Sequence, residues 1–132
     1  MKKKVQIIFE IANNHQGSIS HFENILDDIK CSTKGYEDLF EFKVKFQFRD
    51  LPTFIDKSID PNSNKHIQRF EETQLSKKNW LQIINLVKSK GFKVMITPFD
   101  EKSVQKAIEY GVDEFKIASC SCTEWSLLKE VV

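Results

Sequence analysis

Hydrophobic residues recur along the chain with two different periods, and stretches of the two kinds alternate. Four short runs rich in β-branched and aromatic residues predict strands, and they cover residues 5–11, 42–48, 92–97 and 114–118. The segments between them carry apolar residues three and four positions apart, a spacing that predicts helices with one buried face. The pattern therefore predicts a strand followed by a helix, repeated along the chain.

Each predicted helix has an apolar face. The apolar positions are Ile19, Phe22, Ile25, Leu26 and Ile29 in the first helix, Trp80, Leu81, Ile83, Ile84 and Val87 in the second, Val104, Ala107 and Ile108 in the third, and Trp125, Leu127 and Leu128 in a fourth that begins near Thr123. Ser76 and Asp100 are predicted N-caps, and Gly35, Gly91 and Gly111 stand where helices are expected to end.

Strands that alternate with helices predict an α/β fold with a parallel sheet. Two architectures fit this order, a doubly wound open sheet or part of a (β/α)₈ barrel, and the sequence period does not separate them. A complete barrel needs about 250 residues. On the barrel interpretation, the 132 residues form roughly its first half.

One connection is far longer than the roughly 2–6 residues usual between such elements. Residues 49–73 include Pro52, Pro61 and several Asn and Ser residues. This segment is a candidate for a loop that covers a bound substrate. The alternative is a disordered or merely decorative insertion, and the sequence leaves both interpretations open.

Charge along the chain is almost balanced, with 20 Lys and Arg residues against 19 Asp and Glu residues. No basic face is therefore indicated for nucleic acid or a membrane surface. Lys2, Lys3 and Lys4 could begin a signal peptide, but Gln6 and Glu10 interrupt the apolar run that follows. No stretch approaches the roughly 20 apolar residues of a membrane span, and the three cysteines lack zinc-site spacing. We expect a cytoplasmic protein without a disulfide framework.

Polar residues gather where the predicted strands end, and ligands bind at the carboxyl ends of parallel strands. The candidates are Glu10, Asn13, Asn14, His15 and Gly17 after the first strand, Lys43, Lys45 and Gln47 in the second, Thr97 and Asp100 at the third, and Lys116 and Ser119 at the fourth. A lysine that is removed from water needs an anionic partner. An anionic ligand would supply that partner.

Each of these residues also has a structural interpretation. Lys45 could form an ion pair with Glu10 or Glu41, and His15 could cap its own loop. Asp100 is explained as an N-cap, and the Thr97-Pro98 pair needs only to end a strand. Residues 120–122, Cys-Ser-Cys, could be small residues of a loop. The functional interpretation depends on the convergence of such residues at the ends of four strands.

Four motifs at these strand ends, taken together, resemble those of a known family. They read Glu10-Ile-Ala-Asn-Asn-His-Gln-Gly17, Lys45-Phe-Gln47, Thr97-Pro-Phe-Asp100 and Lys116-Ile-Ala-Ser119. In order and spacing they resemble the N-terminal half of the sialic acid synthase (N-acetylneuraminate synthase) family, and the likeness covers nearly the whole chain.

The resemblance implies a (β/α)₈ barrel followed by a small antifreeze-protein-like domain, with residues 1–132 as the N-terminal part of the barrel. The implied reaction condenses phosphoenolpyruvate with an N-acetylated amino sugar such as N-acetylmannosamine. C3 of phosphoenolpyruvate attacks the open-chain aldehyde, water adds to C2, and inorganic phosphate leaves. A divalent metal, manganese or magnesium, is implied as the cofactor, and a homodimer as the assembly of the full-length protein.

Carried over residue by residue, the resemblance implies that Lys45, Lys116 and Ser119 hold phosphoenolpyruvate and that Gln47 lies near the sugar. Glu10 is the implied catalytic residue, whose carboxylate could orient water or a sugar hydroxyl. The residues implied to shape the pocket are Asn14, His15, Thr97, Phe99, Asp100 and Ser121. Ser121 stands where the family commonly has a glutamate that contacts the acceptor, so the acceptor remains open.

No metal ligand is assigned within the chain, because the resemblance places the metal-binding histidines on later strands. The second half of the barrel and the antifreeze-like domain are likewise expected outside it. We therefore expect that this chain alone does not catalyse the complete reaction. Two other interpretations remain, a non-catalytic half barrel that binds a partner chain, or an aldolase-type enzyme in which Lys45 or Lys116 forms a Schiff base.

Overall fold

A computed structural model describes residues 4–132, so Lys2 and Lys3 of the signal-peptide argument lie outside the described residues. Four strands form its sheet: β1 (Val5–Ala12), β2 (Phe40–Phe48), β3 (Lys93–Pro98) and β4 (Glu114–Phe115). The helices are α1 (Ile19–Thr33), α2 (Leu51–Phe54), α3 (Lys65–Glu72), α4 (Lys77–Ser89), α5 (Glu101–Glu109) and α6 (Trp125–Val131), with short 3₁₀ turns at Pro61–Ser63 and Ser119–Ser121.

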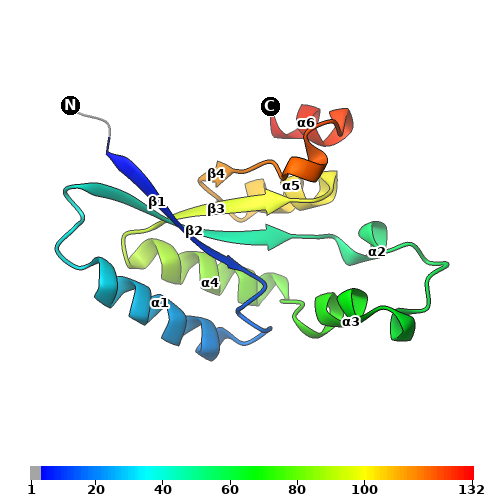
Figure 1. Cartoon of the computed structure of the whole chain (residues 1–132), viewed down its shortest axis with the longest axis horizontal. Helices are drawn as coiled ribbons and strands as arrows, with labels where there is room; N and C mark the ends of the chain where they lie inside the picture. Colours follow the sequence, from blue (N-terminus) through cyan, green and yellow to red (C-terminus); the bar gives the residue numbers. More distant parts are fainter. Residues whose placement is uncertain (1–3) are drawn as a thin grey trace.

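All strand pairs in the sheet are parallel, and their spatial order is the order of the sequence, β1-β2-β3-β4 (Figure 1). A doubly wound sheet reverses direction at a switch point and carries helices on both faces. This sheet has no such point within the described residues, and α1 and α4 lie side by side against one face (Figure 1). The α/β prediction is confirmed, and the arrangement is that of a partial β/α barrel.

The core lies between the sheet and the helices that cover it. Side chains along a strand alternate between the two faces. In β2, Phe42, Val44, Phe46 and Phe48 point toward the helices and are buried against residues of α1, α4 and α5, including Phe22, Leu26, Ile83, Ile84, Val87 and Ala107. The helix-facing side of the sheet is therefore apolar, and the polar members of each strand face the other way, toward the interior of a barrel.

The predicted N-caps and helix ends are confirmed. The Ser76 hydroxyl accepts the backbone N–H of Asn79 at the start of α4, and Asp100 accepts that of Ser103 at the start of α5. Gly35, Gly91 and Gly111 all adopt positive φ angles after the helices that precede them, a conformation that other residues adopt only at a cost.

The fourth strand is shorter than predicted. We expected residues 114–118, but only Glu114 and Phe115 pair as a strand. The backbone N–H of Lys116 still donates to the carbonyl of Ile96 at 2.9 Å. The next bond of a parallel ladder would need an N–H from Pro98, which has none. The ladder therefore ends there, and Lys116 lies in the loop that follows.

Two apolar positions were also assigned wrongly. Ile108 is 60% exposed and Trp125 is 70% exposed, whereas both were expected on buried helix faces. Helix α5 packs instead through Val104 and Ala107, and α6 through Leu127, all of which are buried. No helix in the described part of the chain is long and apolar enough to cross a membrane.

The long connection after β2 is ordered and contains two helices that the sequence did not predict, α2 and α3. Asn64 caps α3 by accepting the backbone N–H groups of His66 and Ile67. Ile67 is buried, and the rings of Phe54 and Phe70 meet at 6.2 Å between centroids. The interpretation of this segment as a disordered insertion is therefore wrong.

Candidate functional site

The face of β2 that points away from the helices carries a row of charged and polar side chains. The row runs Glu41, Lys43, Lys45 and Gln47 at alternate positions, and Arg49 follows at the next one. The carboxyl ends of parallel strands form the ligand-binding edge of such folds. The row therefore runs from the amino-terminal end of the sheet to the edge where ligands bind in such folds, and its members have different partners at each level.

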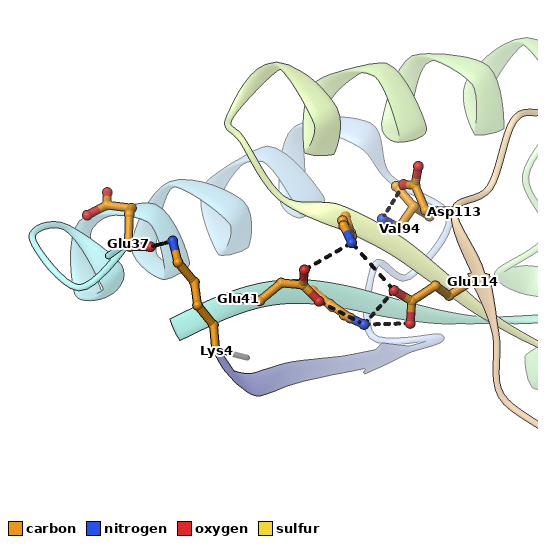
Figure 2. Close-up of polar contacts among 8 residues, drawn as sticks. Lys4, Glu37, Glu41, Val94, Asp113 and Glu114 are labelled. Carbon is orange, nitrogen blue, oxygen red and sulfur yellow. Dashed lines mark hydrogen bonds and ion pairs between the residues drawn. The ribbon is translucent and has the colours of Figure 1, made fainter. Parts of the chain in front are cut away.

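At the amino-terminal end, two lysines and two glutamates neutralise one another. Lys43 is fully buried, and its ammonium lies 2.5 Å from Glu114 and 3.1 Å from Glu41. Lys93 pairs with Glu41 at 2.9 Å. Figure 2 labels Glu41 and Glu114, whose carboxylates are joined by dashed lines to the nitrogens of this network. Burial opposes the charge on Lys43, but the hydrogen bonds that its ammonium donates to Glu114 and Glu41 outweigh this effect and raise the pKa of the lysine. This network has complete charge pairing, so we assign it to stability and not to ligand binding.

One level further along β2, Lys45 joins two other predicted site residues. Its side chain is 10% exposed and forms an ion pair with Glu10 of β1. Its ammonium also donates to the Thr97 hydroxyl of β3 at 3.3 Å. The structure thus brings Glu10, Lys45 and Thr97 together on three adjacent strands. The predicted structural alternative for Lys45, an ion pair with Glu10, is confirmed, whereas Glu41 pairs with Lys43 and Lys93 instead.

Glu10 occupies an irregular point of β1. The register against β2 shifts between Glu10 and Ala12, and Ala12 has a positive φ of 49°. Non-glycine residues adopt that conformation rarely, and bulges of this kind concentrate beside functional sites. The carboxylate of Glu10 remains 47% exposed, so it is accessible to a ligand while it holds the buried ammonium of Lys45.

Gln47 lies beside a residue that the sequence analysis missed. A guanidinium N–H of Arg49 donates to the Gln47 side-chain oxygen at 2.9 Å. The same guanidinium lies 4.1 Å from the ring centroid of Phe99 and 4.4 Å from that of Phe70. Its position two residues beyond Gln47 continues the alternation of the β2 row, and that spacing was the signal that could have revealed it.

Asp100 anchors the start of the long connection. One carboxylate oxygen accepts the backbone N–H of Asp50 at 2.8 Å, and the other accepts that of Ser103 at 2.7 Å. Asp50 in turn accepts from Lys106 at 2.5 Å, and this hydrogen bond lowers the pKa of Asp50. The predicted N-cap role of Asp100 is confirmed, and the residue also ties the connection to α5.

His15 is buried and serves its own loop. Its Nδ1 accepts the backbone N–H of Gly17 at 3.1 Å, and its ring meets Trp80 edge-on at 5.4 Å. The predicted capping role is therefore confirmed. Burial, assisted by the nearby charge of His21, lowers the pKa of His15 to about 4. The imidazole is therefore neutral at pH 7 and able to accept that hydrogen bond.

This lowered pKa predicts a pH-dependent loss of stability. Above pH 6.5 the imidazole is neutral in both folded and unfolded chains; as the pH falls from 6.5 to about 4, only the unfolded chain takes up the proton. We expect the free energy of unfolding, measured by urea denaturation, to fall across that window more steeply in the wild type than in His15→Gln. The control is His66→Gln, at an exposed position of α3. Equal slopes for wild type and His15→Gln would contradict the prediction.

The remaining predicted residues are not joined to the Lys45 cluster by side-chain contacts. Lys116 and Ser119 are exposed in the segment after β4, and Asn14 is exposed in the turn after β1. Ser121 is buried, and its hydroxyl donates to Glu124 at 3.2 Å. Ser121 thus supports the turn that leads into α6. The exposed side chains of Lys116 and Ser119 lie beyond the end of β4, at the same edge of the sheet as Lys45.

A parallel sheet with sequential strand order, helices on one face and polar residues along the other defines the class: a partial β/α barrel with its candidate site at the carboxyl edge. Within this class, the chain belongs to the NeuB family, whose model matches residues 42–132. The chain is 27% identical to the N,N'-diacetyllegionaminic acid synthase of Legionella pneumophila, with 89% of this chain and 33% of that protein covered. It therefore spans about a third of the length of this curated relative.

Solved structures agree on the fold. A protein described as spore coat polysaccharide biosynthesis protein E from Chromobacterium violaceum matches with a TM-score of 0.90 and 40% identity, over 97% of this chain and 38% of that one. The N-acetylneuraminic acid synthetase of Leptospira borgpetersenii, in complex with citrate, matches with a TM-score of 0.75 and 23% identity, over 97% of this chain and 41% of that one. The chain thus corresponds to part of each of these proteins.

Proposed function

We propose that the chain forms the N-terminal part of the barrel of a cytoplasmic nonulosonic acid synthase. This enzyme condenses phosphoenolpyruvate with an N-acetylated amino sugar, such as N-acetylmannosamine, and releases inorganic phosphate. The observation that carries the proposal is the contact of Glu10, Lys45 and Thr97 on three adjacent strands at the carboxyl edge. Membership of a family that includes a legionaminic acid synthase supports it.

The charges at this edge suit the proposed substrate. Phosphoenolpyruvate carries a carboxylate and a phosphate, and ammonium groups stabilise both of them and the charge that develops on the departing phosphate. Lys45, held between Glu10 and Thr97, presents a fixed ammonium, and the exposed Lys116 and Ser119 supply a second cation and a hydroxyl from the loop after β4.

The proposed reaction forms one carbon–carbon bond and exchanges the phosphate oxygen on C2 for a water oxygen. C3 of phosphoenolpyruvate attacks the aldehyde carbon of the open-chain sugar, and the former aldehyde oxygen takes up a proton. Water then adds to C2 and gives up a proton, and phosphate departs from C2. Glu10 is the proposed catalytic residue, since its half-exposed carboxylate is accessible to the water or to a sugar hydroxyl. Gln47 is proposed to contact the sugar with its amide nitrogen, because Arg49 already occupies its oxygen.

The divalent metal of the family does not fit the residues present. No three His, Cys, Asp or Glu side chains lie together as a metal site within residues 4–132. We propose that the metal ligands, the remaining barrel strands and an antifreeze-like domain belong to a longer polypeptide that acts as a homodimer.

The test is phosphate release by the longest natural polypeptide that carries this chain. With phosphoenolpyruvate, N-acetylmannosamine and manganese, we expect phosphate to appear only when an acceptor sugar is present. A panel of N-acetylated and diacetylated amino sugars identifies the preferred acceptor. The isolated residues 1–132 are expected to be inactive in the same assay.

Two outcomes would reject parts of this proposal. Reduction by borohydride that traps a keto acid on Lys45 or Lys116 would show Schiff-base chemistry in place of the proposed mechanism. Acceptor-dependent phosphate release by residues 1–132 alone would show that the later strands are not required.

A further inference from the structure

Arg49 is the cation of the β2 row that has no acidic partner. Lys43 pairs with Glu41 and Glu114, and Lys45 pairs with Glu10. Within residues 4–132, Arg49 forms no ion pair, and its only side-chain hydrogen bond goes to the neutral amide of Gln47. A charge that is partly withdrawn from water is costly unless it is paired. Arg49 therefore differs from Lys43 and Lys45, because its charge is not balanced by an acidic side chain.

The nearest acid does not supply the missing partner. Asp100 contributes to the field at Arg49, but both of its carboxylate oxygens already accept backbone and hydroxyl donors from Asp50 and Ser103. Burial lowers the pKa of Arg49, and Asp100 and Cys120 only oppose that effect. The guanidinium remains charged, because its pKa in proteins stays far above neutrality.

The guanidinium is nevertheless held in one place. Phe99, Phe70 and Phe54 surround it, with ring centroids 4.1, 4.4 and 5.6 Å from the guanidinium carbon. Two of these rings come from the long connection and one from the turn after β3, so three rings from two segments converge on one side chain. Cation–π contacts fix its plane without consuming the N–H groups that lie in that plane.

One of those N–H groups is left without a partner. The Nε atom of Arg49 is buried and has no hydrogen-bond partner within residues 4–132. Arg49, Gln47, Phe70 and Thr73 line a cavity of about 660 Å³ under the long connection. A buried, unpaired N–H of a charged group costs free energy that a ligand acceptor would recover.

We propose that Arg49, oriented by its hydrogen bond to Gln47, forms a binding subsite for an oxyanion group, a carboxylate or a phosphate, at the outer end of the β2 row and separate from the Lys45 cluster. The planar guanidinium presents two parallel N–H groups to such a group, a geometry that an ammonium does not provide. The subsite does not require the proposed synthase reaction, although in such an enzyme it would hold an anionic group at a distance from the reacting carbons.

The test uses inorganic phosphate as the probe, titrated calorimetrically into the longest natural polypeptide that carries this chain. We expect Arg49→Gln to weaken phosphate binding by roughly tenfold or more, and Arg49→Lys to weaken it less, because the charge remains but the paired N–H groups are lost. The matched control is Arg69→Gln, at the only other arginine of this sequence, which is exposed on α3. It should bind phosphate like the wild type.

A second titration, in the presence of saturating phosphoenolpyruvate, separates the two anion sites. Phosphate binding that persists and still depends on Arg49 supports the separate subsite. Loss of phosphate binding under saturating phosphoenolpyruvate would assign Arg49 to the phosphoenolpyruvate site and overturn the proposal. Wild-type phosphate affinity in Arg49→Lys would overturn it as well. If Arg49→Gln does not fold, the affinity of Arg49→Lys alone decides between the two results. A protein that does not bind phosphoenolpyruvate but binds phosphate through Arg49 would refute the proposed function and leave this subsite intact.

Discussion

Replacing Lys43 by methionine should destabilise the protein by about 2 kcal/mol or more, because breaking a buried ion pair leaves its partners uncompensated. Lys43 is fully buried between two glutamates whose side chains are each 32% exposed. That partial exposure lets water relieve part of the loss, so we place the effect below the 3–5 kcal/mol typical of fully enclosed pairs. Chemical denaturation at pH 7 measures it.

The matched control for this prediction is Lys77→Met. Lys77 pairs with Glu109, but both side chains are more than half exposed, and exposed pairs contribute little. The free energy of unfolding of Lys77→Met should therefore stay close to that of the wild type. Adding Glu114→Gln to Lys43→Met should restore part of the lost stability, since the remaining Glu41 still pairs with Lys93 at 2.9 Å. Equal stabilities of Lys43→Met and Lys77→Met would disprove the assignment of this network to stability.

Replacing Lys45 by methionine should lower kcat/KM for phosphoenolpyruvate by roughly a hundredfold or more, the scale on which removal of one fixed electrostatic group slows a reaction. The fold should survive, because Glu10 is half exposed and water can solvate it after its partner is lost. Steady-state kinetics of phosphate release, together with a thermal unfolding curve, separate the two effects. Lys45→Arg should recover part of the activity if the role is electrostatic, and none if Lys45 forms a Schiff base.

The control for Lys45 is Lys93→Met, on the same sheet face but at the amino-terminal end, where the lysine side chain is 50% exposed. Its kinetics should match those of the wild type. Retention of activity within threefold in Lys45→Met would remove Lys45 from the proposed site and leave the structural ion pair with Glu10 as its only role.

Local pattern was sufficient to predict most of the sheet and the long helices. Strand and helix periods depend on neighbouring residues, and the caps at Ser76 and Asp100 depend on a single side chain each. Helix α3 was missed because only Ile67 and Phe70 mark its apolar face over two turns. The end of β4 was missed because it depends on the missing N–H of Pro98, which lies on a different strand.

The site was predictable to the extent that it lies on strands. The motif residues Glu10, Lys45 and Thr97 follow the strand ends, so their meeting required only the correct order of strands. Arg49 was missed because its environment comes from the long connection, whose path over the sheet edge no periodic pattern encodes. The choice between a barrel and a doubly wound sheet also depended on tertiary contacts, because both produce the same alternation along the chain.

The sequential strand order has a consequence for how the chain folds. Each strand after β1 pairs with the strand that precedes it in the sequence. One helix lies between β1 and β2 and one between β3 and β4, whereas the connection between β2 and β3 contains α2, α3 and α4. Short sequence separations between contacting residues favour fast folding, and during synthesis the N-terminal elements emerge first. The sheet can therefore grow in the direction of translation, with β1 and β2 offering a template before β3 leaves the ribosome. Asp100, which joins the start of α5 to Asp50, would then secure the long connection only after the third strand is in place.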